Sequence, residues 1–356
     1  MIDNSSIKRL KSIILAASLI FILLVMPFSS IFAHSPVFAD ENHDPSHAYQ
    51  IDDFTKSWVI YATLDHPDRG DYYKFTASRG DRIYMSLMAA RDPEDSGFLP
   101  SIALLIPNSE KKDGLPSYID IPPGWGAVVI AGKDPGEASY EPFTPGWIYD
   151  IASLDIDAPE DGTYYIVVFD ESQKTGNYSL AVGYVESFTL REWVMIPFSI
   201  HNTYAWEGQN LFATYLPIIL TVVIGSILLF LRKRKGKDPT GLSKWLAAFA
   251  GLTFFGTSFS ILYQMTLAIS ITGFTAAVIV TIIISGIGIV LGVLSLLYAL
   301  RKRQILTMEK RILLIIIGII SIFSWSGFFL GTLLVILAAV VPPYGPSRKL
   351  KIMKGK

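Results

Sequence analysis

Hydrophobic and polar residues follow two different patterns along the chain. In the first half, short runs alternate between apolar and polar residues, and in the second half long apolar runs carry no charge. Alternation with period two is typical of strands with one buried and one solvated face, whereas an apolar helix of about 20 residues can cross the ~30 Å hydrocarbon layer of a bilayer. We therefore predict an all-β domain followed by an all-α membrane domain.

Seven short runs within residues 57–187 predict the strands of the β domain. Each run is rich in β-branched and aromatic residues and is bounded by Gly, Pro or Asp, which favour turns. The close spacing of the runs indicates an antiparallel sandwich of the jelly-roll kind. The predicted strands are 58–63, 71–75, 82–87, 102–106, 126–130, 163–169 and 178–182.

Four long apolar runs predict a four-helix membrane domain. Basic residues follow the first run and the third run. Because Lys and Arg beside a span are retained in the cytoplasm, both of these helix ends are expected inside the cell, and everything before the first span outside it. The predicted spans are 211–231, 246–265, 271–300 and 312–340.

The fourth run allows two topologies. A full crossing, which we expect, places the basic tail of residues 341–356 outside the cell, against the positive-inside tendency. The alternative is a re-entrant hairpin that bends at 321–327, around Trp325, and returns the tail to the cytoplasm; each arm would then be too short to span the bilayer alone.

Residues 1–33 have the features of a secretory signal. Three basic residues precede an apolar stretch, and small residues near Ala33 suit a cleavage site. Cleavage after Ala33, or after Ala39, would create the mature N-terminus, and an uncleaved anchor is the alternative. In each case the following chain is exported, beginning with a polar leader at 34–56.

The balance of 30 basic and 31 acidic residues hides two parts of opposite charge. Residues 34–208 contain 28 acidic and 11 basic residues, a net charge of −17, and the remainder carries +16. An acidic exported part repels nucleic acid, so we expect no nucleic-acid partner. The chain has no Cys, which excludes disulfides, thiolate metal ligands and Cys nucleophiles.

Four blocks of the β domain resemble one known module. They are DYYKF at 71–75, GDRIYMSL at 80–87, APEDGTYYIVV at 158–168 and GNYSLAV at 176–182. In order and spacing they are similar to the bacterial pre-peptidase C-terminal (PPC) domain, a small β-sandwich attached to secreted proteases and surface proteins. The resemblance implies a module that serves binding, secretion or stabilisation and has no active site. The segment 110–151 is longer than the turn of that family, and we expect it to cover a sheet edge; the alternative is a binding loop.

The segment 188–210, which joins the two domains, mixes aromatic and polar residues. Side chains with apolar bodies and polar edges, such as Trp193, Tyr204 and Trp206, collect at membrane surfaces. We predict an interfacial element there. A last strand followed by a linker is the alternative for residues 188–194.

Four of the five histidines lie near the start of the exported part: His34, His43, His47 and His66. Imidazole is a ligand for copper and zinc, and an N-terminal His34 could chelate copper through its amine and ring together. Pro45 disfavours a single helix that presents both His43 and His47. The alternative is a solvated leader that lies against the sandwich.

Two groups of carboxylates suggest a second kind of site, for calcium. Each group lies in a turn that contains a glycine, and clustered oxygen ligands on loops are what calcium requires. Neither group has the spacing of an EF-hand, and the alternative is that the carboxylates bond turn amides or face water. The groups are Asp65, Asp68 and Asp71, and Asp92, Glu94 and Asp95.

Motifs of known enzyme classes are missing from the sequence, including the metalloprotease His-Glu-x-x-His, the nucleophile elbow and the phosphate-binding loop. No Asp, Glu, Lys, Arg or His lies inside the predicted spans, which argues against ion-coupled transport. We expect a plasma-membrane binding or scaffold protein with a membrane-protein or surface partner. The alternatives are an accessory subunit of a membrane complex, such as one that handles copper, and a channel or transporter for uncharged solutes.

Two pairs of glycines with a spacing of four lie in the predicted spans. They are Gly288 with Gly292 and Gly327 with Gly331. Such pairs allow helix backbones to approach closely. We expect them to pack the four helices together, and formation of a homo-oligomer is the alternative.

Overall fold

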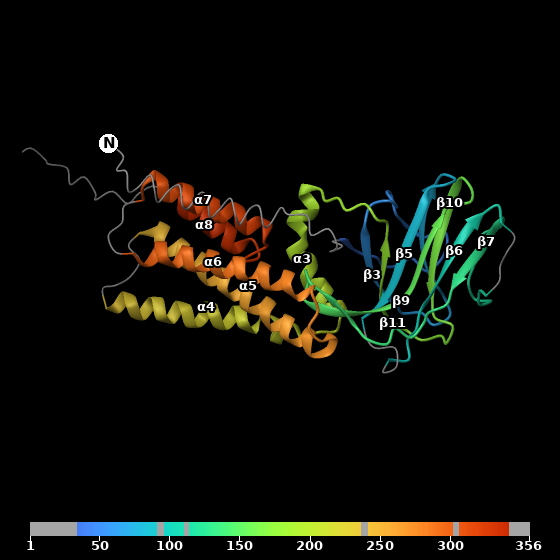
Figure 1. The fold of residues 1–356 in the computed structure, drawn as a ribbon, viewed down its shortest axis with the longest axis horizontal. Coiled ribbons are helices and arrows are strands. Elements are labelled where there is room, and N and C mark those ends of the chain that lie inside the picture. The colour runs from blue at the N-terminus through green and yellow to red at the C-terminus, as the bar shows by residue number, and fades with distance from the viewer. Residues whose placement is uncertain (1–33, 91–95, 110–113, 236–240, 302–305, 342–356) are drawn as a thin grey trace, which may run out of the picture. The chain divides into compact units, whose positions relative to one another are not determined.

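Two β-sheets form the first part of the chain and helices form the second (Figure 1). The computed structural model describes residues 34–90, 96–109, 114–235, 241–301 and 306–341. The predicted signal segment and nearly all of the predicted basic tail lie outside these residues.

The described chain divides into two compact units. One contains residues 34–211 together with Gln264–Val278, and the other contains Phe212–Tyr263 together with residues 279–341. The first unit holds the sandwich and the second holds most of the helices. The predicted order of an all-β part followed by an all-α part is confirmed.

The sandwich consists of a six-stranded and a five-stranded sheet. The strand order is β1-β3-β11-β5-β9-β8 in the first and β2-β4-β10-β6-β7 in the second. Neighbouring strands are antiparallel except that β1 pairs with β3, and β2 with β4, in parallel. The bounds are β1 Ser35–Phe38, β2 Tyr49–Gln50, β3 Trp58–Leu64, β4 Asp71–Ala77, β5 Arg82–Ala89, β6 Ser101–Pro107, β7 Trp125–Ile130, β8 Ser139–Glu141, β9 Gly146–Asp157, β10 Gly162–Phe169 and β11 Gly176–Val182.

The main core of this unit is built from residues that alternate along the strands of both sheets. Tyr73 and Phe75 of β4 and Ile83 and Met85 of β5 are fully buried. Phe75 stacks on Tyr164 of β10 with the ring centroids 5.5 Å apart. Burying a side chain of this size stabilises a fold by about 1.5–3 kcal/mol, so the period-two pattern is the main determinant of the sandwich.

All seven predicted strands are confirmed, as β3, β4, β5, β6, β7, β10 and β11. The predicted polar leader at 34–56 is not a separate segment, because β1 pairs with β3 and β2 pairs with β4. It adds one short strand to an edge of each sheet. Strands of two to four residues are too short to show a period-two pattern in the sequence, so they can be identified only from their pairing with the edges of the folded sheets.

Strand β9 was not predicted, because its alternation changes phase. Tyr149 and Ile151 are buried in its first half, whereas Leu154 and Ile156 pack against the core in its second half. The pairing of β9 with β5 shifts register between these halves. Such a bulge changes which positions face the core, so no single period-two pattern covers the strand.

The described residues of the segment 110–151 cover the sandwich in two ways. β7 and β8 form edges of the two sheets, as expected of a segment that covers sheet edges. In addition, Tyr118 and Ile119 pack with Leu105 and Val167, on the face of the five-stranded sheet that points away from the main core. This segment therefore shields apolar surface that the sandwich alone would leave exposed.

Helix α3 (Leu190–Trp206) follows the sandwich. Its N-cap is Thr189, whose hydroxyl accepts a hydrogen bond from the Glu192 backbone N–H, while the Glu192 carboxylate accepts one from the Thr189 N–H. This capping box fixes the start of a helix. The alternative of a last strand at 188–194 is therefore wrong from Leu190 onward.

Three helices are long and apolar enough to cross a membrane: α4 (Leu211–Arg234), α5 (Leu242–Thr272) and α6 (Val278–Leu300). The first predicted span, 211–231, lies within α4. The second predicted span, 246–265, is too short, because α5 extends beyond it at both ends. The predicted third span began too early, since residues 271 and 272 still belong to α5.

The fourth predicted span, 312–340, is not one helix, and the expected single crossing is wrong. α7 (Met308–Phe323) and α8 (Leu330–Val340) form an antiparallel hairpin, which was the alternative. Ser321 bonds to Thr332 near the turn at 2.7 Å, and Arg311 donates to the carbonyls of α8's far end. At about 1.5 Å per residue neither helix is long enough to cross the ~30 Å layer.

Hydroxyl groups stabilise the turn of this hairpin. Trp325, Gly327 and Phe328 all have positive φ angles, which end the helix. The Gly327 N–H donates to the hydroxyl of Thr257 in α5 at 3.0 Å, and the hydroxyls of Ser324 and Ser326 bond each other at 2.8 Å. Non-helical backbone at membrane depth is stable only when other protein groups satisfy it in this way.

Both glycine pairs lie in contacts between helices of the same chain. A Cβ at Gly288 would collide with the Ser258 hydroxyl, and one at Gly331 would lie 2.6 Å from the Phe254 ring. Both neighbours belong to α5. The pairs therefore pack helices of this chain together, as expected.

Single cysteines can test the hairpin, because the chain has none of its own. Met308 and Val340 are exposed at the two open ends of α7 and α8. We expect Met308→Cys and Val340→Cys to react with a membrane-impermeant maleimide from the same side of sealed vesicles. Phe274→Cys, at the other end of α5, should react from the opposite side. Labelling of positions 308 and 340 from opposite sides would contradict the hairpin.

Candidate metal centre

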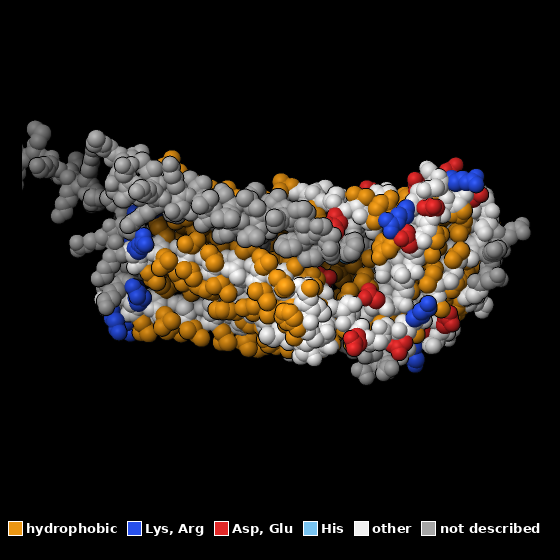
Figure 2. Space-filling model, in the orientation of Figure 1, with side chains coloured by type: hydrophobic (Ala, Val, Ile, Leu, Met, Phe, Trp, Pro, Cys, Tyr) orange, Lys and Arg blue, Asp and Glu red, His pale blue; other side chains and the backbone are white. Residues whose placement is uncertain are grey.

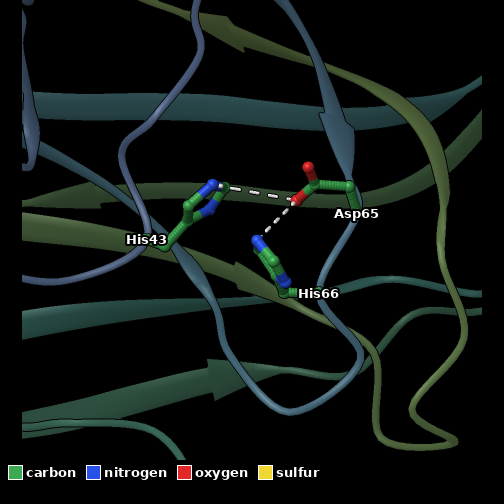
Figure 3. A group of neighbouring side chains, drawn as sticks. All are labelled: His43, Asp65 and His66. Atoms are coloured by element: carbon green, nitrogen blue, oxygen red, sulfur yellow. Dashed lines mark ion pairs between the residues drawn. The ribbon is translucent and has the colours of Figure 1, made fainter.

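Two loops of the sandwich unit bring three potential metal ligands together. Asp65 and His66 follow β3, and His43 lies between β1 and β2. One ligand atom from each residue lies within 4.8 Å of the others. Figure 3 shows the Asp65 carboxylate facing both rings, with its Oδ1 atom 3.7 Å from His43 Nε2 and 3.6 Å from His66 Nε2.

The ring of His43 is oriented by Asp71, the first residue of β4. His43 Nδ1 lies 2.8 Å from Asp71 Oδ1, which leaves Nε2 directed toward Asp65. A histidine that binds a metal typically uses its second ring nitrogen to donate to a carboxylate, which fixes the tautomer and the ring orientation. His43 therefore has the orientation of a metal ligand.

Asp71 is in turn held by the core of the sandwich. Its side chain is 1% exposed, and its second oxygen accepts a hydrogen bond of 2.6 Å from the Tyr178 hydroxyl of β11. The Tyr178 hydroxyl also lies 2.6 Å from that of Tyr73. Burial raises the pKa of Asp71, although hydrogen bonds from Tyr178 and His43 oppose the shift. Burial also raises the pKa of both tyrosines, so their hydroxyls stay protonated and able to donate.

Two imidazole nitrogens and one carboxylate oxygen form a set of ligands that suits zinc or copper better than calcium. The side chains of His43, His66 and Asp65 are 19%, 45% and 53% exposed, so further coordination positions face water. Three protein ligands with an open position allow a bound metal to take water or an external ligand. The arrangement can therefore bind a divalent ion that exchanges with solution.

A polar cavity of about 280 Å³ lies beside this group and shares His43 with it. Its other lining residues include three carboxylates and one guanidinium, so its charge favours cations. Asp68, proposed above as a calcium ligand, lines this cavity and does not join the histidine group. The lining residues are His43, Asp44, Asp68, Arg69, Gly70, Tyr72, Tyr118 and Asp120.

The two other histidines of the predicted copper or zinc site lie elsewhere. His34 Nδ1 is 2.5 Å from the Ser57 hydroxyl, and burial lowers the pKa of His34. His47 Nδ1 is 2.8 Å from an Asp44 oxygen. Hydrogen bonds, first from the Ser46 side chain and then from His47, hold the pKa of Asp44 well below its usual range. The structure therefore brings together His43 and His66 only.

Asp65, Asp68 and Asp71, the first predicted calcium group, are not brought together as one cluster of ligand atoms in the described chain. Asp65 and Asp71 belong to the histidine group, as a potential ligand and as the residue that orients His43. In the part of the chain that the structure describes, the group close enough to share an ion is His43, Asp65 and His66. The second group, Asp92, Glu94 and Asp95, lies outside the described residues.

Tyr73 and Tyr178 were not recognised from the sequence. Both occupy inward positions of predicted strands, where an aromatic residue is ordinarily part of the core. The only available signal was that a tyrosine, rather than phenylalanine, occupies a fully buried position, where its hydroxyl requires a partner.

No protein-family model matches the chain, and a search of curated proteins also finds no match. The resemblance to the PPC domain remains an expectation, and the case for a metal centre depends on the positions of His43, Asp65, His66 and Asp71.

Proposed function

We propose that this chain is a membrane-anchored binding protein whose β-sandwich stands outside the cell and binds a zinc or copper ion at His43, Asp65 and His66. The observation that carries the proposal is the convergence of these three side chains together with the carboxylate of Asp71 behind His43. Polar side chains that are close only by chance need no buried carboxylate to orient them, whereas histidines that bind a metal typically have one.

Charge supports the external position of the sandwich. Residues 34–208 carry a net charge of −17, while the described basic residues of the helical unit lie near one end of that unit (Figure 2). Lys244 donates to the carbonyl of Arg301, and Arg311 contacts the end of α8, so these three residues share that end. Basic helix ends are retained in the cytoplasm. The opposite end, from which the sandwich chain enters α4, then faces outward.

A binding role fits the sequence motifs and the open metal site better than catalysis does. The sequence has no motif of a known enzyme class, and the resemblance to the PPC domain implies a module without an active site. An ion that keeps open positions can be exchanged, or can bridge to a group on another molecule. The protein would then report or present the metal at the cell surface. An accessory subunit that handles copper is the second candidate, because copper accepts the same imidazole ligands.

Metal titration of the full-length protein in detergent, without a histidine tag, tests the proposal. We expect a single ion of Zn²⁺ or Cu²⁺ to bind per chain and Ca²⁺ to bind much more weakly. His43→Ala and His66→Ala should each weaken binding by about 100-fold, since each removes one of three protein ligands. The matched control is His47→Ala, which removes an exposed histidine that bonds Asp44 and should leave the affinity unchanged.

Two results would refute the proposed site. One is Zn²⁺ and Cu²⁺ affinity that is equal in the wild type and in the His43→Ala, His66→Ala double variant. The other is the absence of measurable binding in the folded wild type. A strong preference for copper, together with a membrane protein that co-purifies in stoichiometric amount, would favour the accessory subunit over a solitary binding protein.

A further inference from the structure

Helix α3 presents an apolar face that the sandwich does not cover. Leu190, Val194, Met195 and Phe198 have exposed fractions of 80%, 38%, 48% and 57%. Their spacing of four, one and three residues places them on one side of the helix. Four large apolar side chains on one face are more than a soluble surface helix ordinarily leaves in water.

α3 is attached to the sandwich near both of its ends, so the apolar face cannot turn inward. Near the start, Lys56 Nζ lies 2.6 Å from a Glu192 carboxylate oxygen. At the end, the Trp206 indole N–H donates to the Ala62 carbonyl at 2.9 Å, and Trp206 packs edge-on against Tyr61. The exposure of the apolar face is thus a property of the folded unit.

The chain itself indicates what covers this face. Only residues 207–210 separate the end of α3 from the start of α4, so five Cα–Cα steps, at most about 18 Å in all, join Trp206 to Leu211. α4 carries no charged residue before Arg232, and only 11% of an apolar 18-residue stretch within it is buried, which is typical of a helix surrounded by lipid. The end of α3 therefore lies within about 18 Å of the point where the chain enters the hydrocarbon layer.

We propose that Leu190, Val194, Met195 and Phe198 insert into the boundary between the lipid headgroups and the acyl chains, so that α3 lies on the bilayer as an interfacial helix. Such a helix buries its apolar side about 5–10 Å deep and keeps its polar residues in water. Arg191, which is exposed beside Leu190, is placed to reach a lipid phosphate. The partner of this surface is the lipid bilayer itself.

Fluorescence quenching on the full chain tests this proposal, and the lack of native Cys makes the labelling specific. Met195→Cys and Phe198→Cys carry an environment-sensitive fluorophore in vesicles of phosphatidylcholine with phosphatidylglycerol. The matched control is Thr76→Cys, an exposed residue of β4. Nitroxide-labelled phospholipid should quench positions 195 and 198 at least about twofold more than position 76, and aqueous iodide should quench them at least about threefold less. Unchanged tryptophan emission of each variant shows that it is folded.

Two outcomes would overturn the proposal. If iodide quenches positions 195 and 198 as strongly as position 76, the face lies in water. If both lipid nitroxide and iodide fail to reach these positions, protein covers the face. Diluting the protein in the vesicles then identifies the covering protein. If a second copy covers the face, protection of positions 195 and 198 from iodide decreases on dilution. If another part of the same chain covers it, that protection does not change.

Discussion

Replacing Asp71 with asparagine is expected to weaken the sandwich and the metal centre together. The Asp71→Asn side chain would present one acceptor and an NH₂ group where the structure has a carboxylate that accepts from both His43 and Tyr178. One of these two donors would then lose its partner. Because the Asp71 side chain is only 1% exposed, water cannot replace the lost bond. We expect the free energy of unfolding to fall by about 3 kcal/mol.

The effect on metal binding has a separate cause. With the carboxylate replaced by an amide, His43 and Tyr178 compete for one acceptor oxygen, so the Nδ1–H of His43 is held less firmly and Nε2 is held less firmly toward Asp65. Loss of such a partner lowers metal affinity by about 10–100-fold. Tyr178→Phe separates the two effects, since it removes a bond to Asp71 but leaves the bond between Asp71 and His43 in place. It should destabilise the sandwich with a smaller loss of affinity.

Pulse proteolysis in urea and zinc titration, both on the full-length protein, measure these two quantities. Asp68→Asn is the control, because Asp68 lies in the same turn but is exposed. An Asp71→Asn variant as stable as the Asp68→Asn variant would show that the buried carboxylate does not hold the loops together.

Raising the pH from about 5 to 8 is expected to destabilise the unit that contains the sandwich. Two carboxyl groups meet where the β8–β9 hairpin contacts the end of α3. Glu141 of β8 is paired with Gly146 of β9, and the Glu207 carboxylate lies against Gly146. Burial raises the pKa of Glu141 to about 7, and burial together with the nearby Glu141 raises that of Glu207 well above its usual range. The titratable group that faces both acids is Tyr61 of β3.

The direction follows from proton binding. A carboxyl group whose pKa is raised on folding holds its proton in the folded state at a pH where the unfolded chain has released it. The free energy of unfolding is therefore highest below the ordinary pKa of about 4.5 and decreases until the pH has passed the folded value of about 7. A shift of this size corresponds to about 3 kcal/mol for a fully desolvated acid and to less where water reaches the carboxylate.

Urea midpoints followed by tryptophan fluorescence across this pH range test the prediction. Glu141→Gln and Glu207→Gln keep the shape of the side chains and should each flatten the decrease. Glu192 provides a contrast: burial opposes its ionisation, but hydrogen bonds from Lys56 and Thr189 lower its pKa overall. Its contribution is lost as the pH falls, so Glu192→Gln should not remove the decrease at neutral pH. A midpoint that rises between pH 5 and 8 would contradict the raised pKa values of Glu141 and Glu207.

The two-part architecture could be predicted from the sequence because its signals are local. Alternation within β4 or β10 depends only on neighbouring residues, and so does the uncharged run that becomes α4. Each pattern indicates the surroundings of its segment: water on one face for an alternating strand, and lipid on all sides for an uncharged helix. Such patterns do not depend on where the rest of the chain lies.

Features that arise from pairing between distant segments were missed or placed wrongly. β1 and β2 are too short to show a pattern and exist because β3 and β4 offer edges to them. The bulge in β9 conceals a long strand. The single crossing predicted at 312–340 failed because hydroxyls of α5 and α7 stabilise a turn that hydropathy alone cannot register.

The candidate metal centre shows the same division. The sequence by itself determined that imidazoles and carboxylates gather before and after the first strands, and that no thiolate can take part. Only the tertiary structure decided that His43 and His66 share a site with Asp65. It also decided that Asp71 contacts His43 and accepts a hydrogen bond from the Tyr178 hydroxyl of β11. Ligand geometry depends on which strands are neighbours, and strand order is set by the packing of the whole sandwich.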